Sequence, residues 1–249
     1  MPFTLAHPSI LFPLRWINAK YISFTALVIG SMIPDFEYFL WMRPDAYHSH
    51  TLHGIFIFDL PATFLCAFLF HLFIRKPFLF HFPFFKDKYL LPEIDFVDYL
   101  KKNWLVFTLS ALFGICTHLI WDACSHAQGY FVVRNTFLNG EVSIGGAIIK
   151  RCYLVWYLSS IVGLLLVVIQ GIDFKKILKW KENNSSTAST NRYWGMILFL
   201  TALFLIMRIW NGLSWAWFRH FIISTIGAFM YALIIVSWLE NRKMKKASV

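Results

Sequence analysis

Long apolar stretches separated by short polar connections dominate the pattern of this 249-residue chain. A bilayer core of about 30 Å needs about 20 apolar residues for each helical span. Six stretches meet this requirement, although Gly30 and Pro34 interrupt the first. The pattern predicts an all-α, polytopic transmembrane helical bundle of about six spans, with a further N-terminal helix near residues 3–18. The expected spans are residues 22–41, 54–74, 104–126, 152–171, 194–210 and 218–239.

The composition excludes an ordinary soluble domain, because 58% of the residues are hydrophobic and only 14% are charged. A soluble domain carries about a quarter charged residues. We expect one integral membrane domain over residues 1–249, with a flexible inner connection near residues 181–192, in the stretch "WKENNSSTASTN". The four cysteines show no paired spacing, so neither a disulfide framework nor a cysteine zinc site is indicated.

The basic residues indicate an orientation in the membrane. Of the 23 lysines and arginines, 17 fall on alternate connections between the predicted spans. Basic residues are retained on the cytoplasmic side, so we expect a multi-pass protein of the cell inner (plasma) membrane with both termini cytoplasmic. The positive charge then serves orientation and contact with anionic lipid, and nucleic acid is not an expected partner. The sequence does not predict the oligomeric state. The basic connections are residues 1–21, 75–103, 172–193 and 240–249.

The segment "GICTHLIWDACSH" places three polar side chains at intervals of four residues in an otherwise apolar span. Successive residues of an α-helix are 100° apart, so His118, Asp122 and His126 drift by only about 40° per step and form one narrow stripe. Imidazole and carboxylate groups on such a stripe can ligate zinc or a similar divalent metal. The alternative is a His–Asp hydrogen bond between helices, without a metal.

Further polar residues are expected at the same outer ends of the spans. An ionised acid in the centre of a span costs at least about 2.5–3.5 kcal/mol, and a metal ion would neutralise several acids together. The pattern therefore favours a metal site at the outer face. If this site is catalytic, we expect Asp59 to orient a ligating imidazole and Glu37 or Glu141 to act as a general base. The residues expected near it are Asp35, Glu37, Asp45, His48, His50, His53, Asp59 and Glu141.

Three stretches carry a resemblance to a known family: "MPFTLAHPSILFPLR", "TALVIGSMIPDFEYFL" and "SHTLHGIFIFDLP". They resemble a bacterial integral membrane family of unknown function, DUF4184. More remotely, the order of motifs is similar to that of membrane-bound metal-dependent hydrolases related to YdjM, and of zinc-dependent phospholipase C and the P1-type nucleases. The shared order is an early His, a Pro-Asp segment, a His-rich segment and a helical His-x3-Asp-x3–5-His.

The resemblance implies a ligand set for one to three divalent metal ions, with zinc the expected metal. The predicted topology places His7 on the inner side, away from the other ligands, so the two expectations conflict at this residue. The implied ligands are His7, Asp35, His50 or His53, His118, Asp122 and His126.

The expected function is a membrane-embedded, metal-dependent hydrolase with an outward-facing His/Asp site, acting on a phosphoester or lipid-linked substrate. Membrane lipids are its expected partners. Two other classes stay open: a non-catalytic membrane scaffold stabilised by metal, and an ion- or proton-coupled transporter.

Overall fold

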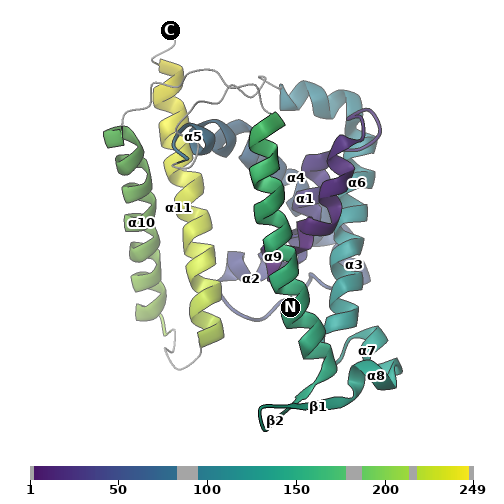
Figure 1. Cartoon of the computed structure of the whole chain (residues 1–249). Helices are drawn as coiled ribbons and strands as arrows, with labels where there is room; N and C mark the ends of the chain where they lie inside the picture. The colour runs from purple at the N-terminus through teal and green to yellow at the C-terminus, as the bar shows by residue number, and fades with distance from the viewer. Residues whose placement is uncertain (1–2, 83–94, 178–186, 213–217, 247–249) are drawn as a thin grey trace. The chain divides into compact units, whose positions relative to one another are not determined.

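A computed structural model describes residues 3–82, 95–177, 187–212 and 218–246, with only the backbone described for residues 171–177. The regular elements that these residues form are helices, apart from one two-stranded hairpin (Figure 1). Five helices are long and apolar enough to cross a membrane, and they coincide with the predicted spans other than the first. These helices are Leu52–Phe80, Phe96–Ser125, Arg151–Gln170, Thr187–Trp210 and Phe218–Lys246.

The predicted span at residues 22–41, which Gly30 and Pro34 interrupt in the sequence, does not form one continuous helix. This segment forms two short helices, α1 (Phe24–Gly30) and α2 (Ile33–Trp41), joined by a turn at Ser31. Pro34 lies in the first turn of α2, where its missing N–H group costs no helical hydrogen bond. A proline is tolerated at a helix start and disrupts a helix interior, so the chain divides here.

The chain forms two compact units, each of which is described by itself. Unit 1 comprises Met1–Asp35, His48–Thr63 and Lys102–Ile177, and unit 2 comprises Phe36–Tyr47, Phe64–Lys101 and Leu178–Val249. The predicted flexible connection near residues 181–192 lies outside the described residues as far as residue 186. Its remainder, residues 187–192, begins helix α10 instead.

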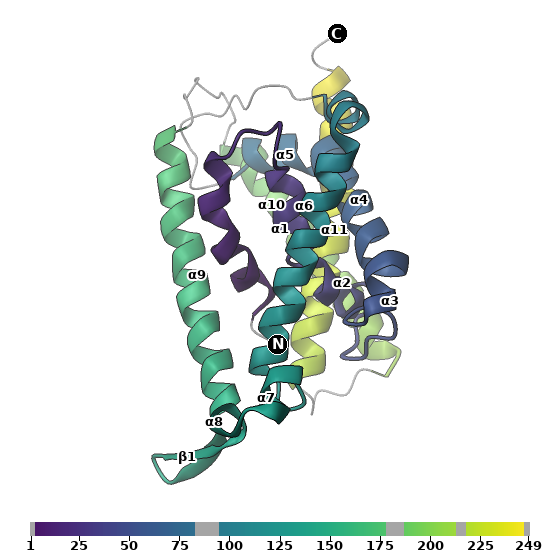
Figure 2. The same cartoon turned by 90° about the vertical axis from the view of Figure 1, so that its right-hand side faces the viewer.

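Unit 1 begins with a 3₁₀ helix, η1 (Thr4–Trp16), that runs antiparallel to α1 (Figure 2). The rings of Phe12 and Phe24 meet edge to face between the two, 5.6 Å apart. Helix α9 (Arg151–Ile177) covers η1, because Gly163 lets the backbone of Ala6 approach closely. The remaining elements with residues in unit 1 are α3 (Leu52–Gly54), the π-helix η2 (Ile55–Asp59), the start of α4 (Leu60–Leu69), most of α6 (Phe96–Ser125), α7 (Tyr130–Arg134), α8 (Thr136–Asn139), β1 (Glu141–Ile144) and β2 (Ala147–Lys150).

Two glycines allow α1 and α6 to pack backbone against backbone. A Cβ atom added to Gly114 would lie 2.4 Å from the carbonyl oxygen of Leu27, and one added to Gly30 would lie 2.5 Å from that of Ala111. Small residues permit such close crossings between helices in membrane proteins. Because Gly114 is one helical turn before His118, this crossing fixes the backbone position of His118.

Unit 2 is centred on α10 (Thr187–Trp210) and α11 (Phe218–Lys246). Tyr193, Ile197, Ala232 and Val236 form its buried apolar cluster, and the Tyr193 hydroxyl bonds to Ser237 over 2.7 Å. The π-helix η3 (Phe70–Ile74) and α5 (Arg75–Phe80) complete the unit, together with parts of α2, α4 and α6.

Substituting Gly114 by alanine should lower the stability of unit 1. The added methyl group collides with the Leu27 carbonyl, and forced overpacking of this kind costs about 1–3 kcal/mol. Thermal unfolding in detergent should show a lower midpoint. The matched control is Gly195→Ala in α10, where a Cβ atom meets nothing within 4 Å, and this variant should be as stable as the wild type or slightly more so. Equal midpoints for the two variants would disprove the tight crossing.

Candidate metal centre

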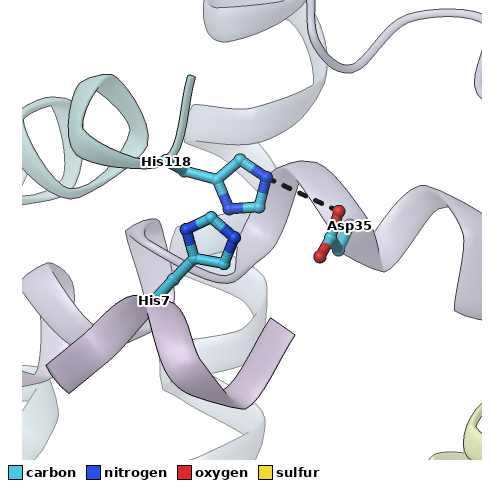
Figure 3. Close-up of side chains that lie close together, drawn as sticks. All are labelled: His7, Asp35 and His118. Carbon is cyan, nitrogen blue, oxygen red and sulfur yellow. Dashed lines mark ion pairs between the residues drawn. The ribbon is translucent and has the colours of Figure 1, made fainter. Parts of the chain in front are cut away.

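Two overlapping groups of potential metal ligands lie in unit 1. One consists of His7, Asp35 and His118, and the other of His50, His118 and Asp122, with the ligand atoms of each group within 4.8 Å of one another. Figure 3 shows the first group, in which His7 on η1 and Asp35 on α2 approach His118 on α6. Five side chains from four separate segments of the chain therefore converge on one small volume.

Four contacts between imidazole and carboxylate define the centre of this cluster. His118 Nε2 lies 3.5 Å from Asp35 Oδ1 and 3.5 Å from Asp122 Oδ2. His50 Nε2 lies 3.6 Å and 3.4 Å from the same two oxygens. These distances exceed the 2.7–3.2 Å range of good hydrogen bonds. They match the separation of about 2.8–3.9 Å that neighbouring ligands have around an ion bound at about 2.0–2.4 Å.

The orientation of His118 is fixed by its other ring nitrogen. His118 Nδ1 lies 2.7 Å from the carbonyl oxygen of Ser31, which can only accept a hydrogen bond. Nδ1 therefore donates, and Nε2 points at the two carboxylates. A neutral His118 would direct a lone pair at both acids, an arrangement that is stable only with a cation between them. Metal-ligating histidines are held in this way, with the remaining N–H donated to a carbonyl.

Asp35 is fully buried and is held through one of its oxygens. The Thr4 hydroxyl donates to Asp35 Oδ2 over 2.5 Å, which leaves Oδ1 directed at the two histidines. Residues three apart in a 3₁₀ helix lie on the same side, so Thr4 and His7 face the cluster together. Each aspartate oxygen thus has a separate role.

His50 approaches the cluster from a strained loop. Its φ angle is +62°, a left-handed conformation that is uncommon for residues other than glycine. Its Nδ1 lies 3.0 Å from the Ser49 hydroxyl, and this contact orients Nε2 toward the carboxylates. Burial by itself would lower the pKa of His50, but the contacts with Asp122 and Asp35 outweigh it and raise that pKa.

His7 completes the cluster as a neutral imidazole. Its ring stacks on that of His118 with centroids 3.9 Å apart, and its Nε2 lies 4.0 Å from Asp122 Oδ1. Burial, followed by the neighbouring charge of His118, lowers the pKa of His7 to about 3. The neutral form is the one that binds metal. The predicted topology separated His7 from the other ligands, whereas the antiparallel pairing of η1 with α1 brings it among them.

Several atoms of the cluster are buried and have no hydrogen-bond partner among the described residues. A buried polar atom left unsatisfied costs about 1–3 kcal/mol, so a group of them in one place is suited to binding a ligand. A divalent ion would satisfy them together, and this donor set of imidazole nitrogen and carboxylate oxygen suits it. The atoms are His7 Nδ1 and Nε2, Asp35 Oδ1, His118 Nε2 and Asp122 Oδ1.

The cluster is open on one side. The side chains of Asp35 and His118 are fully buried, whereas those of His50 and His126 are 22% and 37% exposed. His126 Nδ1 lies 3.0 Å from the Asp122 carbonyl oxygen and 3.7 Å from Asp122 Oδ1. Of the predicted stripe, His118 and Asp122 lie on α6, whereas His126 directly follows its last residue at the exposed edge and belongs to neither ligand group.

Neither ligand group includes the other predicted site residues. His53 is exposed, so of the two alternatives in the His-rich segment the structure brings His50 to the cluster. Glu37 belongs to unit 2, where it accepts a hydrogen bond from the Tyr47 N–H group. Asp59 is fully buried in η2, and Glu141 is exposed in β1.

The residues that support the ligands were not predicted from sequence patterns. Thr4 and Ser31 each fix one ligand, and the Trp121 ring contacts the edge of His7 while its Nε1 donates to Ser159. The one available signal was the three-residue spacing of Thr4 and His7, which is informative only if η1 is known to be a 3₁₀ helix.

The comparison with protein families identifies the family of this chain. The family model for the domain of unknown function DUF4184 matches residues 1–238. The chain belongs to the DUF4184 family. No curated protein and no solved structure gives a significant match. All five residues of the two ligand groups lie within the region that defines the family.

Replacing Thr4 by valine should weaken metal binding while keeping the fold, because the shape of the side chain is retained and only the hydrogen bond to Asp35 is lost. Loss of such a supporting contact typically costs 10–100-fold in metal affinity. Titration of the metal-free protein with zinc would measure the change. The control is Thr201→Val in unit 2, whose hydroxyl bonds only within its own helix and which should bind like the wild type. Unchanged affinity in Thr4→Val would contradict the supporting role.

Proposed function

We propose that this member of the DUF4184 family is a membrane-embedded, metal-dependent hydrolase that acts on a phosphoester or lipid-linked substrate. The observation that carries the proposal is the set of four contacts of 3.4–3.6 Å that joins His50 and His118 to Asp35 and Asp122. This geometry is too open for hydrogen bonds and has the spacing of ligands around one cation.

The donor set fits zinc or a similar divalent ion, because it combines neutral imidazoles with carboxylates. Two carboxylates balance the charge of one divalent ion, so the buried centre would be neutral. His50, His118, Asp35 and Asp122 would hold the metal, with His7 beside them. A metal of this type lowers the pKa of bound water toward 7 and polarises a phosphoryl oxygen.

The residues around the metal position would divide the remaining tasks. Ser31 and Thr4 fix the angles of His118 and Asp35. Water and substrate would enter on the side of His50 and His126, because these are the exposed side chains of the cluster. The predicted roles of Glu37 and Glu141 as general bases, and of Asp59 in orienting an imidazole, stay predictions.

The membrane orientation is part of the proposal. Basic residues follow the helices Leu52–Phe80 and Arg151–Gln170, and others lie at the end of Phe218–Lys246. They support a bacterial inner-membrane protein in which these three helix ends are on the cytoplasmic side. The connection at residues 126–150 then lies on the outer side, with the open edge of the cluster.

A second candidate function is a metal-stabilised scaffold without catalysis. The complete burial of Asp35 and His118 favours it, since structural metal sites are closed whereas catalytic sites keep an open position. The exposure of His50 argues for the enzyme. The two functions differ in turnover and agree in metal content.

Metal content tests the shared part of both functions. The purified wild type should contain about one or more divalent ions per chain, and His50→Ala should lose most of it because half of the four central contacts are removed. His53→Ala changes an exposed histidine three residues away and should retain the wild-type content. Elemental analysis of the three proteins, each confirmed as folded by thermal unfolding, gives the answer. Equal, near-zero metal in all three would eliminate the metal centre.

Hydrolysis distinguishes the enzyme from the scaffold. The metal-loaded wild type should cleave a chromogenic phosphodiester or a phospholipid headgroup, lose the activity when a chelator removes the metal, and regain it with zinc. His53→Ala should keep the activity and Asp122→Asn should lose at least about 100-fold, since a missing ligand abolishes the positioned metal. A protein that retains tightly bound metal but cleaves none of these substrates would support the scaffold.

A further inference from the structure

The connection between α6 and α9 forms a separate small platform at residues 130–150. It consists of α7, α8 and the hairpin β1–β2. The helix that precedes it, Phe96–Ser125, and the helix that follows it, Arg151–Gln170, are both candidate membrane spans. A connection of this kind emerges from the bilayer and returns to it, so it lies at one membrane surface.

The hairpin has one wholly apolar face and one mixed face. Its antiparallel register pairs Glu141 with Lys150, Val142 with Ile149, Ser143 with Ile148 and Ile144 with Ala147. Paired residues point to the same side of a sheet and neighbours alternate. One face therefore carries Val142, Ile144, Ala147 and Ile149, whereas the other carries Glu141, Ser143, Ile148 and Lys150.

Part of the apolar face is not covered by other residues of unit 1. Ile144 is half exposed, and Ala147 beside it is also exposed. A two-stranded hairpin is marginally stable in water by itself, so this one needs a surface to pack against. The two helices next to the hairpin expose further large apolar side chains, namely Tyr130, Phe131, Val133 and Phe137.

Basic side chains surround this apolar surface. The Arg134 guanidinium lies 3.9 Å from the centre of the Tyr130 ring, and that of Arg151 lies 4.9 Å from the centre of the Phe137 ring. Lys150 contacts the Asn139 side chain. No ion pair with a carboxylate involves any of the three cations among the described residues. Cations beside exposed aromatic rings are typical of residues at the membrane interface.

We propose that this platform binds the phospholipid surface of one leaflet, with the apolar face of the hairpin and the aromatic side chains among the lipids. Arg134, Lys150 and Arg151 would contact lipid phosphate groups. The occupant is lipid and not another protein because the platform is continuous with two membrane helices. The proposal does not depend on the metal centre.

The platform is firmly attached to the helix that carries Asp122. A Cβ atom added to Gly129 would lie 2.4 Å from the Ala123 carbonyl oxygen, so the chain turns back tightly against the last turn of α6. The Gly129 N–H group donates to the His126 carbonyl oxygen over 2.8 Å. If the proposed function holds, lipid phosphates on the platform would lie a few residues along the chain from the exposed edge of the site.

Two adjacent positions on opposite faces of the hairpin test the proposal. The photoreactive amino acid p-benzoylphenylalanine is placed at Ile144 in one full-length protein and at Ser143 in another. Both are reconstituted in vesicles of phosphatidylglycerol and phosphatidylethanolamine and irradiated, and mass spectrometry quantifies the lipid adducts. Position 144 should give several-fold more lipid adduct than position 143, with or without a chelator.

Equal adduct yields at the two positions would overturn the proposal, as would crosslinking of position 144 to a second copy of the chain. Because the readout is the same in metal-free protein, failure of the lipid platform is distinguishable from failure of the metal centre. As a second measurement, Arg134→Gln combined with Lys150→Gln should reduce the phosphatidylglycerol that copurifies with the protein. Arg219→Gln, which removes an exposed charge at the start of α11, serves as the control for loss of a surface charge.

Discussion

Two buried carboxylates that face the same two imidazoles are the constraint on which unit 1 depends. Asp35 and Asp122 can be ionised at this place only if positive charge lies between them. The surrounding contacts maintain that arrangement: the Gly30–Gly114 crossing sets the helix positions, Ser31 turns His118, and Thr4 turns Asp35. Apolar packing alone would not require so many polar contacts that orient side chains toward one point.

The required positive charge can come from protons or from a metal ion, and the geometry separates the two. Protonated His50 and His118 would also balance two carboxylates, but protonated pairs form short hydrogen bonds of about 2.7–2.9 Å. The four contacts are 3.4–3.6 Å, which favours a larger cation at their centre. The positive φ of His50 supports a functional site, since strain of this kind persists only where the surroundings enforce it.

Sequence patterns predicted the five long helices and the stripe on α6, because hydropathy and helical periodicity are local properties. They failed at residues 22–41, where the total apolar length suggested one span although Pro34 marked a helix start. They could not separate His50 from His53, because the choice depends on one left-handed backbone angle in the loop. Nor could they identify Thr4 and Ser31, whose roles arise from contacts between distant segments. Glu37 accepts a hydrogen bond from the N–H group of Tyr47, and its role as a general base stays a prediction.

The distribution of burial within the cluster limits how a metal can be acquired. His7, Asp35 and His118 are buried, so a metal ion that reached them after folding would pass the exposed edge at His50 and His126. His50 lies on a short loop and not on a long helix, so of the four central ligands it is the one that can move aside with the least disruption of packing. Entry of the metal and entry of a substrate would therefore use the same side of the cluster, and His50 would control both.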